Sequence, residues 1–127
     1  MESQDTQRQR VLIVEDEGVI GRVFRKVLTK YGFIVDVVPN GIMAINNLNN
    51  RCYNLCILDL RMPGIDGFEL YRYLHKNYRE LSRKVVFTTG DITGSQIHKF
   101  LKRSERVCLQ KPFTPKELIE AVEYAMN

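Results

Sequence analysis

The sequence predicts an α/β fold in which a parallel β-sheet is covered on both faces by helices. Short apolar runs alternate five times with segments of helical periodicity along the 127 residues. Short apolar runs bounded by turn residues are typical of strands buried on both faces. Parallel neighbours need crossover connections, and helices supply them while covering the sheet. We expect one domain over residues 10–127, preceded by a polar tail at residues 1–9.

The first strand and helix are the clearest elements. Four apolar residues at 11–14 form the strand, and apolar residues then recur at helical spacing over 19–31. Gly32 marks the end of this helix, because a residue without a Cβ enters the left-handed C-terminal turn cheaply. A second strand is expected at 33–38, and a short, asparagine-rich and therefore weak helix follows at 42–48.

The third strand, residues 55–58, is a continuous apolar run that ends directly at Asp59. After the following loop, Asp66 and Glu69 have the spacing of a capping box. In that motif the two side chains satisfy free backbone N–H groups at a helix start. The apolar spacing over 68–74 therefore predicts a helix that begins at Asp66.

The last two strand–helix units occupy the C-terminal third of the chain. We expect a strand at 85–87 and a helix around 97–101 that is the least stable of the set, since glycines flank it. The final strand is expected at 107–109. The last helix begins at Thr114, with proline at its first position and Glu117 completing a second capping box.

Composition excludes several classes of protein. The chain is 44% apolar and 27% charged, as is usual for a globular domain. No apolar run reaches the roughly 20 residues of a transmembrane helix, and the N-terminus is too polar for a signal peptide, so we expect a cytoplasmic protein with no membrane role. The net charge of +4 is too mild to favour direct nucleic-acid binding. The three cysteines lack metal spacing, and Cys56 and Cys108 are expected to be buried thiols.

Polar residues that follow four of the five strands predict a site. Ligands of open parallel sheets bind at the carboxyl ends of the strands, where these residues converge. In chain order, the residues are Glu15 and Asp16, then Asp59, then Thr88 and Thr89, and finally Lys111. Thr89 is the better candidate for a functional hydroxyl and Thr88 for a structural one.

The chemistry of this set points to phosphoryl transfer. Three carboxylates at one sheet edge repel one another, and Lys111 offsets only one of their charges. Mg²⁺ suits a site with one or two carboxylates, waters and a phosphate. A carboxylate beside a metal is also a nucleophile toward phosphorus, and phosphoryl transfer needs mainly positioning and charge neutralisation. The residues therefore predict an aspartyl phosphate on Asp59.

Four motifs stand in a fixed order along nearly the whole chain, from about Val11 to the C-terminus. They are Glu15-Asp16, Asp59 before Met62-Pro63-Gly64-x-Asp66-Gly67, Thr89-Gly90 and Lys111-Pro112-Phe113. In order and spacing they resemble the receiver domain of bacterial-type response regulators in two-component signalling, including single-domain regulators of the chemotaxis type. This resemblance implies a flavodoxin-like, doubly wound (βα)5 fold with strand order 2-1-3-4-5.

The resemblance also implies residue roles. Asp59 would accept the phosphoryl group from a phosphohistidine on a sensor kinase or a relay protein. Thr89 would move to meet a phosphoryl oxygen, Lys111 would pair with it, and the peptide bond before Pro112 would be cis. The surface around the helix expected at 97–101, the strand at 107–109 and the helix that begins at Thr114 would change on phosphorylation. Asp16, Asp59 and the backbone carbonyl of Arg61 would ligate Mg²⁺ directly, and Glu15 would act on it through water.

Three positions depart from the usual receiver pattern or tune it. Cys108 stands where many receivers carry Tyr or Phe. The change on phosphorylation would therefore pass through the 90–94 loop and the helix expected at 97–101, or a partner would bind another face. Arg61 and Asp91 occupy positions that tune phosphate lifetime in the family. Their opposite charges would either bridge the site and slow self-dephosphorylation, or remain two independent solvated charges.

Several alternatives stay open at the level of sequence. A pseudo-receiver would bind partners without phosphorylation. A phosphohydrolase resembling the haloacid-dehalogenase class is disfavoured, because Arg61 stands where that class needs a proton-donating acid. The basic residues over 98–106 form either a solvated helix face or a docking surface for an acidic partner. The sequence leaves open whether the chain is a stand-alone receiver, a relay intermediate or part of a hybrid kinase, whether it forms a homodimer, and whether its self-phosphorylation makes it an enzyme.

Overall fold

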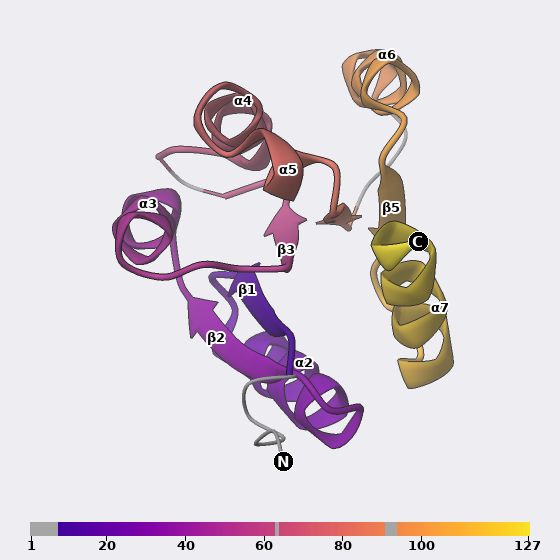
Figure 1. Cartoon of the computed structure of the whole chain (residues 1–127). Helices are drawn as coiled ribbons and strands as arrows, with labels where there is room; N and C mark the ends of the chain where they lie inside the picture. Colours follow the sequence, from indigo (N-terminus) through magenta and orange to yellow (C-terminus); the bar gives the residue numbers. More distant parts are fainter. Residues whose placement is uncertain (1–7, 63, 91–93) are drawn as a thin grey trace.

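Five parallel strands form one sheet in the order β2-β1-β3-β4-β5 (Figure 1). The computed structural model describes residues 8–62, 64–90 and 94–127. The strands are β1 (Arg10–Val14), β2 (Ile34–Val38), β3 (Leu55–Asp59), β4 (Val85–Thr89) and β5 (Val107–Gln110). The helices within the described ranges are α2 (Gly18–Lys30), α3 (Gly41–Asn50), α4 (Gly67–Asn77), α5 (Arg79–Ser82), α6 (Ser95–Ser104) and α7 (Pro115–Met126). The strand order confirms the predicted flavodoxin-like topology.

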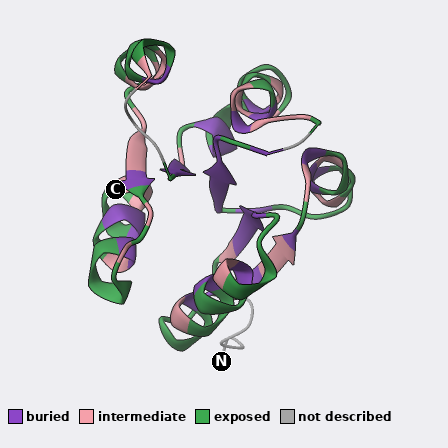
Figure 2. Cartoon of the chain, turned by 180° about the vertical axis from the view of Figure 1, so that it is seen from behind, coloured by how far each residue is buried: buried purple, intermediate pink, exposed green. Residues whose placement is uncertain are grey.

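Helices cover both faces of the sheet, as the apolar strands predict. Figure 1 shows α3, α4 and α6 on one face, with α2 and α7 on the other. Leu12, Leu58 and Phe87 belong to the first core layer, whereas Ile13 and Ile57 belong to the second. Neighbouring residues of a strand point to opposite faces, so each strand contributes to both layers. Figure 2 shows the buried positions concentrated on the strands and on the inward sides of the helices.

The predicted helix boundaries follow from local hydrogen bonds. Asp66 Oδ1 accepts from the backbone N–H of Glu69 at 2.9 Å, and Thr114 Oγ1 accepts from that of Glu117 at 3.1 Å. The side chain of each glutamate accepts in turn from the backbone N–H of the cap residue, so both predicted capping boxes are confirmed. Gly32 has φ 107°, the left-handed conformation expected after α2.

Two features of the fold differ from the sequence-based expectation. The single-turn helix α5 was not predicted, because four residues are too few to show an apolar stripe. Its last residue, Ser82, is buried and donates its hydroxyl to the carbonyl of Arg79 at 2.6 Å. The strands β3 and β4 also extend further than their apolar runs, so Asp59 and Thr89 are the last residues of strands rather than loop residues.

Some predictions concern residues outside the described ranges, namely most of the polar tail, Pro63 and Asp91. The carbonyl of Gln9, at the end of that tail, accepts from the N–H of Ile34 at 2.9 Å. Among the helices that the structure describes, none is both long and apolar enough to cross a membrane.

Candidate functional site

One ammonium group joins two buried carboxylates at the carboxyl edge of the sheet. Lys111 Nζ lies 2.8 Å from Glu15 Oε1 and 2.9 Å from Asp59 Oδ2. Glu15 follows β1, Asp59 ends β3 and Lys111 follows β5, so parallel strands bring them together from distant parts of the sequence. The two acids are only 3% and 4% exposed. The structure therefore places these three predicted site residues in direct contact.

Burial and charge act in opposite directions at this contact. Burial raises the pKa of Glu15 above its ordinary value, although the Lys111 ammonium partly offsets this effect. Burial alone would lower the pKa of Lys111, but its hydrogen bonds to Glu15 and Asp59 raise it overall. Lys111 is therefore a cation at neutral pH, positioned to stabilise negative charge at the end of β3.

Backbone groups fix the position of Asp59. Its Oδ1 accepts from the N–H of Arg61 at 3.0 Å, and the next residue, Leu60, donates its N–H to the carbonyl of Thr88 at 2.9 Å. The start of α4 packs on the same backbone, because a Cβ built on Gly67 would lie 2.5 Å from the Asp59 carbonyl oxygen. Both oxygens of the Asp59 carboxylate thus have a defined direction.

A group of three acids lies beside this contact. Ligand oxygens of Glu15, Asp16 and Glu17 lie within 4.8 Å of one another, and Glu15 is buried whereas the other two are exposed. Glu15 Oε2 accepts from the N–H of Glu17 at 3.1 Å. The buried Oε1 contacts the Lys111 ammonium at 2.8 Å. A buried carboxylate oxygen beside two exposed carboxylates is a donor set that suits a hard cation such as Mg²⁺.

This acidic group differs in membership from the predicted magnesium ligands. It includes Glu17, which was not among the predicted ligands. The run Glu15-Asp16-Glu17 was the available signal for Glu17. Glu17 is also the N-cap residue of α2, and its side chain makes no capping hydrogen bond.

The remaining predicted residues lie around the same edge. Thr88 and Thr89 are both buried, and the N–H of Lys111 donates to the Thr89 carbonyl at 2.8 Å. The Lys111–Pro112 peptide bond is cis, as the family resemblance implies. The side chain of Arg61 is exposed, while Asp91 lies outside the described residues. An ion pair between Arg61 and Asp91 over the site stays a prediction.

Comparison with known proteins decides the family. The model of the response regulator receiver domain matches residues 11–123. The chain belongs to the response regulator receiver family. It is 37% identical over 114 residues to the transcriptional activator protein IrlR of Burkholderia pseudomallei strain K96243. That match covers 89% of this chain and 48% of IrlR, so this receiver chain spans about half the length of that relative.

Solved receiver structures have the same fold. The receiver domain of the sensor histidine kinase PA1611 from Pseudomonas aeruginosa PAO1 superposes with a TM-score of 0.80 and 26% identity, over 94% of this chain and 98% of that one. That structure contains a magnesium ion coordinated in its active site cleft. The chemotaxis protein CheY4 of Vibrio cholerae has a TM-score of 0.83 at 22% identity, over 93% of this chain and 98% of that one. At this identity the likeness supports the fold and nothing further.

Aromatic rings from α4 and α6 pack on Phe87 of β4. Cys108 pairs with Phe87 in the strand register, and burial raises the pKa of its thiol to about 11. The ring of Phe100, on α6, lies 5.2 Å from that of Phe87 and 4.6 Å from that of Phe68. Phe100 thus joins α6 to both β4 and α4 through ring contacts.

Proposed function

We propose that this receiver domain accepts a phosphoryl group on Asp59 from a phosphohistidine of a sensor kinase or a phosphotransfer protein, in a reaction that requires Mg²⁺. The observation that supports this most directly is the Lys111 ammonium held between Glu15 and Asp59. In the transfer, a carboxylate oxygen of Asp59 attacks the phosphorus and forms a P–O bond. The P–N bond breaks, and its electron pair returns to the imidazole nitrogen of the donor.

Each neighbouring residue has a role in this proposal. Lys111 stabilises the negative charge of the phosphoryl oxygens, and the Thr89 hydroxyl moves to contact one of them. Mg²⁺ would be held by Asp16, Asp59 and the backbone carbonyl of Arg61, with Glu15 acting through water. It would supply the charge neutralisation that phosphoryl transfer needs. The fit rests on the donor set around Glu15, whose carboxylate oxygen lies within 4.8 Å of those of Asp16 and Glu17.

The proposal extends to the domain and its output. We take residues 10–127 as the receiver domain, acting in the cytoplasm, and the surface of α6, β5 and α7 as the part that changes on phosphorylation. Lys111 directly follows β5, and the N–H of Lys111 bonds to Thr89 at the end of β4. A change at the phosphoryl group is thereby connected through the backbone to the strand that lies between α6 and α7 in the sequence.

The start of α2 offers a docking surface for the phosphodonor. Val19 and Val23 are 66% and 43% exposed and lie four residues apart, so they share one face of the helix just after the exposed Asp16. Exposed apolar side chains beside a reactive group favour a protein partner. Val19→Asp should slow transfer from a phosphohistidine protein and leave transfer from acetyl phosphate unchanged. Equal slowing with both donors would contradict this docking surface.

Intact mass spectrometry after incubation with acetyl phosphate and Mg²⁺ tests the proposed phosphorylation. We expect a single phosphoryl adduct that is lost with EDTA and in Asp59→Asn. Glu120→Gln, which removes an exposed carboxylate from α7, is the matched control and should keep the adduct. An adduct that persists in Asp59→Asn would refute the assignment of Asp59. No adduct with acetyl phosphate or with phosphohistidine donors would favour a pseudo-receiver.

A further inference from the structure

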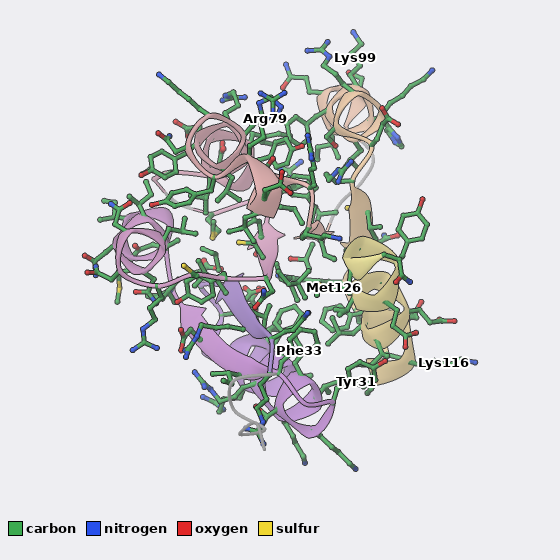
Figure 3. All side chains as sticks on the ribbon, in the orientation of Figure 1. Tyr31, Phe33, Arg79, Lys99, Lys116 and Met126 are labelled. Atoms are coloured by element: carbon green, nitrogen blue, oxygen red, sulfur yellow. The ribbon has the colours of Figure 1, made fainter. Side chains whose placement is uncertain are left out.

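An arginine-lined cleft lies between α4, α5 and α6, away from the phosphoryl site. Its volume is about 620 Å³, and its lining contains no acidic residue within the described chain. The lining includes five arginines: Arg72, Arg79, Arg83, Arg103 and Arg106. Figure 3 labels Arg79 between α4 and α6, with Lys99 on the outward side of α6. Five guanidinium groups around one hollow are a concentration of positive charge that favours an anionic ligand.

The cleft is remote from Asp59 along the direction of α4. That helix begins at Gly67, against the backbone of Asp59, and runs for 11 residues, about 16 Å at 1.5 Å per residue. The cleft is lined by α4 residues from Tyr71 onward and by α5 and the second half of α6. A ligand there would therefore not contact Asp59, Glu15 or Lys111.

Most of the five guanidinium groups are available to a ligand. Arg83 forms an exposed ion pair with Glu80 at 3.3 Å. Arg106 is held by two backbone carbonyls, since Nη1 donates to that of Arg83 at 2.6 Å and Nε to that of Ser104 at 3.1 Å. The other three arginines, Arg72, Arg79 and Arg103, are exposed and form no ion pair with any residue in the described part of the chain.

Helix dipoles explain only part of this cluster. Cations are favourable near helix C-termini, and Arg103 lies in the last turn of α6. Arg72 precedes the last turn of α4, and Arg79 begins the single-turn helix α5. Neither of these two satisfies the C-terminal carbonyls of a long helix. Their convergence with Arg103 from another helix is the feature that a ligand would explain.

Aromatic rings form the apolar part of the cleft. Tyr71 and Phe100 both line it and are half-buried, with ring centroids 5.7 Å apart and planes at 85°. His75 adds a ring 6.3 Å from that of Tyr71. The cleft therefore combines flat apolar surfaces with several fork-shaped donors, and its volume falls within the roughly 300–1,000 Å³ of small-molecule sites.

We propose that this cleft binds a nucleotide with two or more phosphate groups. Guanidinium groups match phosphate oxygens with paired hydrogen bonds, and several of them around one hollow fit more than one phosphate. The faces and edges of Tyr71 and Phe100 offer contact to the base. Inorganic phosphate has no base and would make no use of these aromatic surfaces.

Calorimetric titration of the full chain with ATP, GTP and inorganic pyrophosphate tests this proposal. EDTA is present throughout, so that the acidic site holds no cation. At least one nucleotide should bind more tightly than pyrophosphate. The double variant Arg79→Gln/Arg103→Gln should weaken its binding tenfold or more, as expected from losing charge-assisted hydrogen bonds. Lys99→Gln/Lys102→Gln removes the same charge from exposed positions of α6 that do not line the cleft, and should have little effect.

Several outcomes would overturn the nucleotide site. They are the absence of nucleotide binding at millimolar concentration, equal weakening by the two double variants, and pyrophosphate binding as tight as that of the nucleotides. Displacement of a bound nucleotide by a lower concentration of a polyglutamate peptide would instead assign the cleft to an acidic protein partner. Binding should be unchanged in Asp59→Asn, so failure of this proposal is distinguishable from failure of the proposed phosphorylation.

Discussion

Replacing Gly67 with alanine would press a methyl group against the backbone that positions Asp59. The new Cβ would lie 2.5 Å from the carbonyl oxygen of Asp59 and 2.7 Å from Cα of Leu60. Ordinary Cβ contacts are 3.4–4 Å, so the start of α4 and the end of β3 must separate by about 1 Å. Both neighbours are backbone atoms, and no change of rotamer can relieve the contact.

The size of the effect follows from two opposing terms. Forcing extra volume into a packed site costs about 1–3 kcal/mol. Alanine recovers at most about 1 kcal/mol through its higher helix propensity, and less at the first position of a helix. We expect Gly67→Ala to lower the free energy of unfolding by about 2 kcal/mol. Because the shift involves the Asp59 backbone, phosphorylation by acetyl phosphate should slow as well.

Urea unfolding of Gly67→Ala beside Gly18→Ala measures the effect against a matched control. Gly18 is the first residue of α2, and a Cβ there would have its nearest neighbour, Arg22 Nη1, at 3.6 Å. That control should change stability by no more than about 0.5 kcal/mol. Equal stability of the two variants, or wild-type phosphorylation by Gly67→Ala, would refute the close packing of α4 on β3.

Three further predictions concern other contacts. In EDTA, Lys111→Met leaves two buried carboxylates without their cation and should cost about 3 kcal/mol in urea unfolding; a loss below about 1 kcal/mol would contradict the ion pairs. Tyr53→Phe removes the hydrogen bond to Asp36 Oδ2 at 2.6 Å and should cost about 1–2 kcal/mol at pH 7. Since burial, followed by that bond, raises the pKa of Tyr53 from 10.0 to about 12, this stabilisation is complete below pH 10 and is lost between pH 10 and 12; a stability difference unchanged across that range would refute it. Iodoacetamide at pH 8 should modify the exposed Cys52 and spare Cys108, whose pKa of about 11 leaves about one thiol in a thousand ionised; equal rates measured by mass spectrometry would argue against its burial.

Local signals in the sequence account for the predictable part of the fold. The apolar run before Asp59 identifies a strand buried on both faces, and Gly32, Asp66 and Thr114 mark helix ends through hydrogen bonds or conformations that depend on a few adjacent residues. The same reasoning places polar residues at one sheet edge, because parallel strands end together. Contact between Lys111 and its two acids follows from that topology.

Features that depend on packing between distant segments were not predictable. The helix α5 is too short for a periodic signal, and the arginine cleft joins Arg72 and Arg79 to Arg103 across a separation of more than 20 residues. Their convergence depends on how α6 lies against α4, which aromatic contacts decide. The set of acids near Glu15 was predicted in part, because Glu17, whose ligand oxygen lies close to those of Glu15 and Asp16, was not among the predicted ligands.

The aromatic cluster on α6 connects the two proposed sites physically. Phe68 follows the first residue of α4, next to the Asp59 backbone, and its ring lies 4.6 Å from Phe100. Phe100 in turn lies 5.7 Å from Tyr71, and these two rings line the arginine cleft. With only a thiol at Cys108, a displacement of the loops at the phosphoryl site would reach α6 through these rings. Such a displacement would also change the shape of the cleft, and thermodynamic linkage then requires that phosphorylation and ligand binding alter each other's free energy by the same amount.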